Sequence, residues 1–250
     1  MKRMLLISLL ITMFCLTGIV NAINLDEFTG KTLDKMWTYR DPLKKGTYKL
    51  DGGKLLLDLK AGADMYIKGT DGGVCFLMDP PDLANFSVEM LLNVATMAGD
   101  KQAPACHAGP LFFNEALWAY SAWGPYNAGQ DIRLEDCVGG SYRWRNETQI
   151  AVDVAKVAID KDLYLKITKT GNKLEFFAKG AANDQWVSGG IDELLGPNYT
   201  KGNYKVGIFA KSWGGSVDTS FTFEYFDIPE IPKAVDSHGK LATTWSTIKN

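Results

Sequence analysis

The chain has 250 residues, of which 46% are hydrophobic and 22% are charged, and its formal net charge at pH 7 is −2. Nothing in this slightly acidic balance indicates the basic stripe that a nucleic-acid-binding surface needs, so no nucleic-acid partner is expected. The length suits one large all-β domain, which commonly reaches about 200–250 residues. Beyond the first 22 residues, no apolar run is long enough to cross a bilayer.

The first segment, residues 1–22, has the three parts of a secretory signal peptide. Lys2 and Arg3 give a positive start, residues 5–20 are mostly apolar, and residues 20–22 (Val-Asn-Ala) offer small side chains for cleavage. The alternative is an uncleaved membrane anchor, but the apolar stretch is short for a span and polar residues interrupt it. We therefore predict a secreted, periplasmic or cell-surface protein with no membrane span after cleavage. Removing the two basic residues moves the formal net charge from −2 to −4.

The rest of the chain is dominated by alternation of apolar and polar side chains, which is the pattern of half-buried β-strands. At residues 221–225, for example, it puts Phe221, Phe223 and Tyr225 on one face. The same alternation recurs at residues 55–59, 86–94, 163–167, 174–178 and 206–210. Residues 170–172 (Thr-Gly-Asn) predict a tight turn between two of these strands.

Many strands with turn residues between them predict an all-β fold, a two-sheet antiparallel β-sandwich. Only residues 191–195 and the C-terminal tail could form short helices. The predicted organisation is a signal peptide at 1–22, a sandwich at 23–230 and a tail at 231–250. In the tail, Leu241, Trp245 and Ile248 could form an apolar stripe that either docks onto the sandwich or binds a partner.

The stretch Asp-Glu-Phe at residues 26–28, followed by Met-Trp-Thr-Tyr-Arg-Asp-Pro at residues 36–42, resembles the start of concanavalin A-like (LamG-like) jelly-roll domains. Further similar stretches lie at residues 86–89, 108–113, 163–167, 206–210 and 221–226. Within that group the chain resembles the DUF1349 proteins and the C-terminal β-sandwich of family 43 β-xylosidases. The resemblance implies a concanavalin-like jelly roll, but it leaves the activity open because one fold can host many functions.

An aromatic stretch at residues 117–145 departs from the family pattern and is the candidate ligand-binding region. Flat rings can stack on the apolar faces of sugars, while arginine hydrogen-bonds their hydroxyl groups. The alternative is that the rings fill the interior of the sandwich, because alternation sends about half of them inward. The candidate residues are Trp118, Tyr120, Trp123, Tyr142, Arg143 and Trp144.

Acidic residues at the two ends of the predicted sandwich suggest a structural calcium site. Asp26 opens the first strand and Asp227 closes the last, and similar sandwiches hold Ca²⁺ where these strands meet. Calcium prefers several carboxylate and carbonyl oxygens, which these residues and nearby backbone could supply. The alternative is a pair of solvated strand-end acids.

Cleavage of the signal peptide would remove Cys15 and leave three cysteines. An oxidising compartment then allows one disulfide and one remaining thiol, or no disulfide at all. We predict a disulfide between Cys106 and Cys137, which flank a region of predicted strands. The alternative is that these two cysteines and Cys75 are buried thiols that act as small hydrophobic residues.

The favoured function is carbohydrate binding by a secreted β-sandwich, with a polysaccharide or glycan as partner. The first alternative is a glycoside hydrolase, which needs two carboxylates across the scissile bond. The scattered candidates for that role are Glu89, Asp131, Glu135 and Asp136. A polysaccharide lyase would bring together a group such as His107, Tyr120 and Arg143. The remaining alternative is a non-catalytic cell-surface structural or interaction protein.

Overall fold

The computed structural model describes ten stretches of the chain, all of them between Leu25 and Pro232. They are residues 25–65, 73–93, 106–126, 131–139, 141–142, 150–153, 155–157, 162–193, 196–213 and 218–232. The predicted signal peptide and the apolar stripe of the tail lie outside these residues. Within them, no helix has the length and apolar character needed to cross a bilayer.

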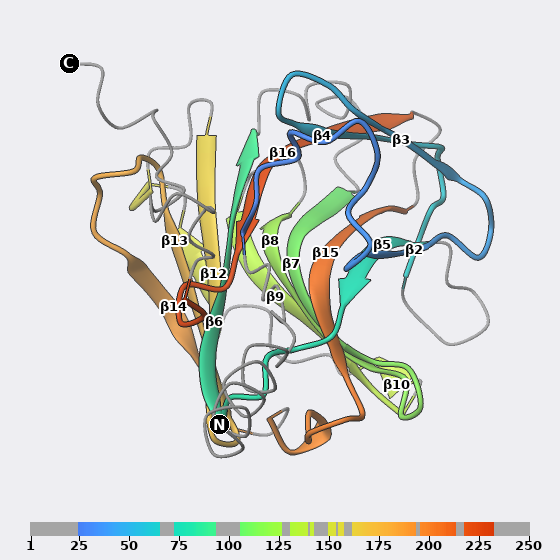
Figure 1. The fold of residues 1–250 in the computed structure, drawn as a ribbon. Coiled ribbons are helices and arrows are strands. Elements are labelled where there is room, and N and C mark those ends of the chain that lie inside the picture. Colours follow the sequence, from blue (N-terminus) through green and yellow to red (C-terminus); the bar gives the residue numbers. More distant parts are fainter. Residues whose placement is uncertain are drawn as a thin grey trace, which may run out of the picture. The chain divides into compact units, whose positions relative to one another are not determined.

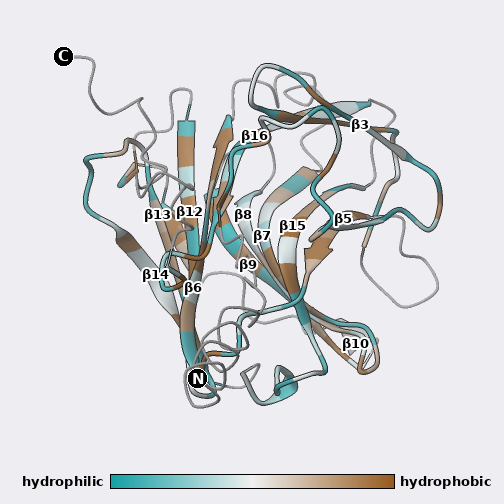
Figure 2. Cartoon of the chain, in the orientation of Figure 1, coloured by the Kyte–Doolittle hydropathy of each residue, from teal (hydrophilic) through white to brown (hydrophobic). Residues whose placement is uncertain are grey.

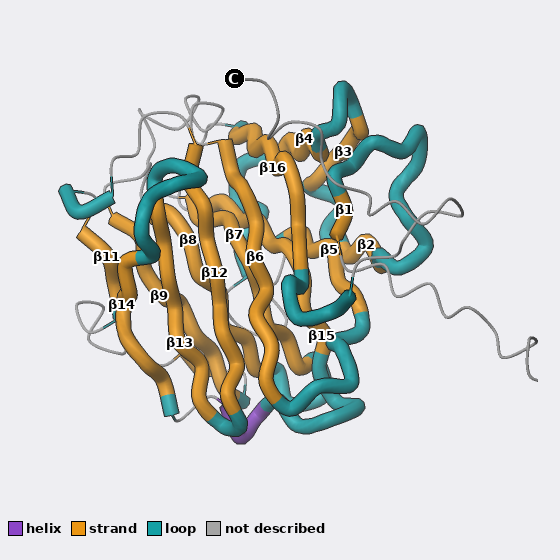
Figure 3. The backbone as a smooth tube through the Cα atoms, turned by 60° about the vertical axis from the view of Figure 1, so that its left-hand side comes forward, coloured by secondary structure: helices purple, strands orange, loops and turns teal. Residues whose placement is uncertain are grey.

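Two antiparallel sheets form the fold, and their strands are labelled in Figure 1. Sheet A has the order β14-β13-β12-β6-β16-β4-β3, with β1 paired to β16. Its strands are β1 (Leu25–Asp26), β3 (Gly46–Leu50), β4 (Leu55–Leu59), β6 (Asn85–Asn93), β12 (Asp162–Thr170), β13 (Lys173–Lys179), β14 (Val187–Asp192) and β16 (Thr219–Asp227). Figure 3 shows β13, β12, β6 and β16 running side by side.

Sheet B has the order β10-β9-β8-β7-β15-β5-β2, with β11 paired to β9. Its strands are β2 (Thr38–Arg40), β5 (Val74–Met78), β7 (Cys106–Asn114), β8 (Ala119–Tyr126), β9 (Asp131–Val138), β10 (Ser141–Tyr142), β11 (Ala151–Asp153) and β15 (Lys205–Ser212). The predicted all-β, two-sheet antiparallel sandwich is therefore confirmed. The helical content of the described residues is one 3-10 turn at Gly196–Asn198. The helix expected at 191–195 does not begin at Ile191, because Ile191 and Asp192 belong to β14.

The main core lies between the inner faces of the two sheets, and in strands such as β4 and β12 every second side chain is buried in it. Figure 2 shows these apolar positions in brown along the strands. Sheet A contributes Val88, Met90 and Leu92 from β6 and Leu163, Leu165 and Ile167 from β12, while sheet B contributes Ala108 and Phe112 from β7 and Val206, Ile208 and Ala210 from β15. The turn predicted at residues 170–172 joins β12 to β13, with Gly171 at a φ of 55°.

Strand β16 differs from the prediction because it contains a β-bulge. The register shifts between Phe223 and Tyr225, so Glu224 is an extra residue in the strand. A bulge reverses the side on which the following residues point. Phe226 is therefore fully buried in the core, whereas Tyr225 is only half-buried on the outer face. The expectation that Tyr225 faces the core is wrong.

Candidate functional site on the outer face of sheet B

Titratable side chains form a row across the outer face of sheet B. On β7, His107 lies directly opposite Tyr126 of β8 and Lys211 of β15, and Tyr126 in turn lies opposite Asp131 of β9. Residues that face each other in antiparallel strands point to the same side of the sheet. The register of four neighbouring strands thus gathers these groups on one surface.

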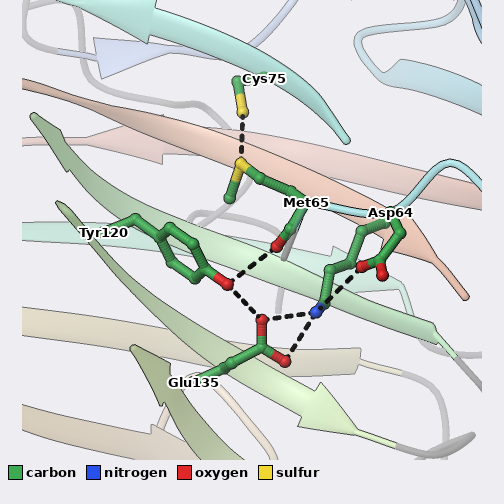
Figure 4. Close-up of polar contacts among 6 residues, drawn as sticks. Asp64, Met65, Cys75, Tyr120 and Glu135 are labelled. Carbon is green, nitrogen blue, oxygen red and sulfur yellow. Dashed lines mark hydrogen bonds and ion pairs between the residues drawn. The ribbon is translucent and has the colours of Figure 1, made fainter. Parts of the chain in front are cut away.

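Lys211 is the centre of a buried polar network, shown in Figure 4. Its Nζ lies 2.6 Å from Glu135 Oε2 and 3.5 Å from Asp64 Oδ1. The Tyr120 hydroxyl lies 2.8 Å from both Glu135 Oε1 and the carbonyl oxygen of Met65. The side chains of Lys211 and Glu135 are only 2% and 4% exposed. The network therefore holds a desolvated ion pair under the segment that carries Asp64 and Met65.

Two glycines let the strands between Glu135 and Lys211 lie close together. Glu135 projects from β9 and Lys211 from β15, with β8 and β7 between them. Gly109 of β7 has a φ of 154°, and a Cβ there would lie 2.0 Å from the carbonyl oxygen of Trp123. A Cβ at Gly124 of β8 would lie 1.9 Å from the carbonyl oxygen of Ala108. A side chain at either position would push β7 and β8 apart and so lengthen the span that Lys211 and Glu135 bridge.

His107 is a buried, uncharged imidazole beside this network. Burial, together with the positive charges of Lys211 and Arg133, holds the pKa of His107 well below its usual value of 6.5. Backbone groups of Arg133 and Gly124 lie near the ring and oppose that shift. Even so, within the described residues neither ring nitrogen has a hydrogen bond of normal geometry. The ring packs edge-on against Phe209, with centroids 4.8 Å apart.

Tyr126 and Trp213 form a tilted ring pair at the edge of this row, and we call them the Tyr126–Trp213 site. Their centroids are 4.9 Å apart, and both residues are only half-buried. The Arg133 guanidinium lies 4.2 Å from the Tyr126 ring, and Lys211 Nζ lies 4.6 Å from the Trp213 ring. The Arg133 Nε–H donates to Asp131 Oδ1 over 3.0 Å. The site thus combines accessible rings with charged groups held at fixed positions.

Three of the predicted ligand-binding rings are buried and lie outside the Tyr126–Trp213 site. Trp118 is 3% exposed, and Tyr120 and Trp123 are fully buried. Trp123 points into the main core and donates from Nε1 to the carbonyl oxygen of Phe177 over 2.9 Å. The expectation that these three rings form an exposed stacking surface is wrong, because both faces of sheet B are covered where they lie. Of the others, Arg143 and Trp144 and the side chain of Tyr142 lie outside the described residues.

The residues of the Tyr126–Trp213 site are not among the predicted ligand-binding residues, although Tyr126 lies within the aromatic stretch at residues 117–145. Lys211 and Trp213 are two positions apart, which places them on one face of a strand. The signal for this site in the sequence is a lysine and a tryptophan, two positions apart, that follow the apolar run at residues 206–210. Their proximity to Tyr126 depends on the pairing of β15 with β7, which is a non-local contact.

The predicted disulfide is not formed. Cys75, Cys106 and Cys137 are all buried thiols. Cys106 belongs to the main core, whereas Cys137 belongs to an apolar cluster on the outer face of sheet B. Side chains on opposite faces of a sheet cannot bring their sulfur atoms to the bond length of about 2 Å that a disulfide requires. The alternative of three buried thiols describes the structure.

Asp26 and Asp227 do not share a site. Asp26 lies opposite Phe226, and successive residues of a strand point to opposite faces, so Asp26 and Asp227 are on different sides of sheet A. The Asp26 carboxylate accepts from the Phe28 N–H and from Trp37 Nε1–H, each over 2.7 Å. Among the described residues, no cluster of three His, Cys, Asp or Glu side chains could hold a metal ion. Calcium binding stays a prediction that this pair alone does not support.

The buried His107 should make the protein less stable in mild acid. Its pKa is lower in the folded than in the unfolded chain, so its stabilising contribution is complete above pH 6.5 and is lost as the pH falls below that value. We expect the free energy of unfolding to fall by about 1 kcal/mol between pH 6.5 and pH 5.5. Urea denaturation at the two pH values measures this change. The His107→Leu variant should lose it, and an unchanged slope in that variant would refute the assignment.

No family model matches the chain, and no curated protein matches it significantly. Solved structures do match it. The GH43 protein BlXynB of Bacillus licheniformis is 20% identical with a TM-score of 0.63, over 83% of this chain and 39% of that one. A xylan β-1,4-xylosidase of Bacillus halodurans is 16% identical with a TM-score of 0.57, over 82% and 38%. A functionally unknown protein of Saccharomyces cerevisiae is 14% identical with a TM-score of 0.56, over 78% and 97%.

At these identities the likeness shows the fold alone. The chain spans about two-fifths of the length of the two Bacillus proteins. The resemblance to the C-terminal β-sandwich of family 43 β-xylosidases is thereby confirmed at the level of the fold. The chain thus shares a two-sheet β-sandwich fold with part of these larger proteins.

Proposed function

We propose that this protein is a secreted, periplasmic or cell-surface carbohydrate-binding β-sandwich, and that it binds its glycan at the Tyr126–Trp213 site. The observation that carries the proposal is the half-buried ring pair itself, flanked by Arg133 and Lys211 and backed by the neutral imidazole of His107. The fold adds support, because the similar domains belong to proteins that act on glycans.

The chemistry of the site suits a sugar. Aromatic rings can stack on the apolar C–H faces of a pyranose, as they do on other flat apolar surfaces. Sugar hydroxyl groups both donate and accept hydrogen bonds, so they can bind the guanidinium of Arg133 and the carboxylate of Asp131. The charged groups are already paired with each other, which keeps them oriented before the ligand arrives.

Replacing Trp213 by alanine should weaken glycan binding by about tenfold to a hundredfold, because one buried aromatic contact contributes about 1.5–3 kcal/mol. A glycan array that includes xylan, followed by isothermal titration calorimetry with the polysaccharide that binds, measures the change. The matched control is Ile191→Ala, which removes an exposed apolar side chain from sheet A. Equal affinity for Trp213→Ala and the unmodified protein would place the ligand elsewhere, and silence across the array would refute carbohydrate binding.

A second candidate function is polysaccharide lyase activity, because Tyr126 and Arg133 lie in contact on one partly accessible face. A lyase abstracts a proton beside a uronate carboxylate and expels the glycosidic oxygen, which leaves an unsaturated sugar. Incubation with pectate and alginate, followed by ultraviolet detection of the unsaturated product, tests this activity. Product formation that is lost in Tyr126→Phe would favour the enzyme over the binding module.

A further inference from the structure

A groove of about 540 Å³ opens at the opposite end of β7 from His107. Phe113, on the same outer face of sheet B, lines this groove and lies six positions after His107 in β7. At about 3.3 Å per residue, the groove and the Tyr126–Trp213 site are about 20 Å apart along the strand. The volume is within the range of about 300–1,000 Å³ that is typical of small-ligand sites.

The groove repeats the chemistry of the Tyr126–Trp213 site. The Arg40 guanidinium lies 5.3 Å from the centre of the Phe113 ring and 3.5 Å from Glu115 Oε1. Lys205 Nζ lies 2.6 Å from Asp79 Oδ1, and both of these residues also line the groove. Each cation is therefore paired with a carboxylate beside an apolar surface, as Arg133 is paired with Asp131 at the other end of the sheet.

Tyr204 extends the groove around the end of the sandwich. It lines the first groove and also a second one of about 580 Å³, which share Asp79 and Gly202 as well. Only 6% of Tyr204 is exposed, and burial raises its pKa to about 12. At neutral pH it is an uncharged phenol, whose hydroxyl group can donate or accept a hydrogen bond.

Formal charge is balanced at both places. In the groove, Arg40 and Lys205 face Glu115 and Asp79, and at the Tyr126–Trp213 site Arg133 and Lys211 face Asp131 and Glu135. A polyanionic ligand would gain no net attraction from such surfaces and would lie close to carboxylates. Neutral sugars, with hydroxyl groups that donate and accept, match alternating donors and acceptors.

We propose that the groove is a second saccharide subsite, and that the ligand is one extended, uncharged polysaccharide chain. This chain would reach from the groove to the Tyr126–Trp213 site by passing over the residues, such as Met65 and Trp118, that cover the outer face of sheet B between them. This inference rests on the proposed carbohydrate binding. Two subsites on one rigid sheet make the second contact intramolecular, so affinity should rise steeply once the chain is long enough to reach both.

The test is isothermal titration calorimetry with xylo-oligosaccharides and cello-oligosaccharides, from the disaccharide to the hexasaccharide. The double variant Lys205→Ala/Asp79→Ala removes one ion pair from the groove. It should lower the affinity for the longest binding oligosaccharide by about tenfold and leave the affinity for the shortest unchanged. The matched control, Lys173→Ala/Glu193→Ala, removes an exposed ion pair from sheet A and should change neither affinity.

The outcomes separate the two proposals. In one outcome, the groove variant binds long oligosaccharides as tightly as the unmodified protein does, while Trp213→Ala binds them more weakly. That result would overturn the second subsite alone. Tighter binding of polygalacturonate than of any neutral chain would overturn the uncharged ligand. No binding of any saccharide would overturn both the groove and the carbohydrate-binding function.

Discussion

Replacing Lys211 by methionine is expected to lower the free energy of unfolding by about 3–5 kcal/mol, because the change leaves the Glu135 carboxylate buried without its cation. Methionine keeps most of the length and volume of the lysine side chain, so the loss reports on charge rather than on a cavity. Urea denaturation at pH 7, followed by circular dichroism, measures the effect. Glycan binding at the Tyr126–Trp213 site should weaken in parallel, since Lys211 lies against Trp213.

The double variant Lys211→Met/Glu135→Leu serves as the control for that result. Removing both charges together should restore most of the stability, because a buried ion pair and an apolar pair of similar volume are often close in free energy. The exposed pair formed by Lys173 and Glu193 offers the opposite comparison, and Lys173→Ala should have almost no effect. A small loss in Lys211→Met, comparable to that of Lys173→Ala, would show that the Lys211–Glu135 contact does not stabilise the fold.

Trp123→Ala is expected to destabilise the protein by about 3–5 kcal/mol, the usual range for removing a large aromatic side chain from a core. Its ring is fully buried, packs at 5.4 Å from Phe176, and donates from Nε1 to the backbone of β13. The substitution therefore opens a cavity between the two sheets and breaks the hydrogen bond that joins them. Thermal and urea denaturation of the variant give the loss directly.

Trp213→Ala is the natural comparison, because the same residue type is removed from a half-buried position. We expect it to change the free energy of unfolding by less than about 1 kcal/mol while glycan binding falls. Trp123→Ala should thus mainly lower the free energy of unfolding, whereas Trp213→Ala should mainly lower the affinity for the glycan. Similar stability losses in both variants would contradict the assignment of Trp213 to an accessible site.

The strands could be predicted from the sequence because their evidence is local. At residues 163–167, for example, alternation puts Leu163, Leu165 and Ile167 on one face, and all three are buried in the main core. Alternation also assumes an uninterrupted strand. The extra residue Glu224 breaks that assumption in β16, and this is why Tyr225 was assigned to the wrong face.

The functional residues could not be predicted in the same way. Alternation correctly puts Tyr120 and Trp123 on opposite faces of β8, but it does not reveal whether a second layer covers either face. The outer face near Tyr120 is covered by Met65 and Trp118, so that ring is buried although it points away from the main core. The contact between Tyr126 and Trp213 depends on β7 lying between β8 and β15, which no local pattern specifies.

The full burial of His107 has a consequence for how ligand binding depends on pH. The ring is shielded from water and lies beside two cations, so it stays uncharged in the folded protein through its usual titration range. It therefore adds no titrating charge to the surface that a ligand meets at the Tyr126–Trp213 site. We expect glycan affinity to show no histidine titration near pH 6.5, although the stability of the fold falls with pH in that range.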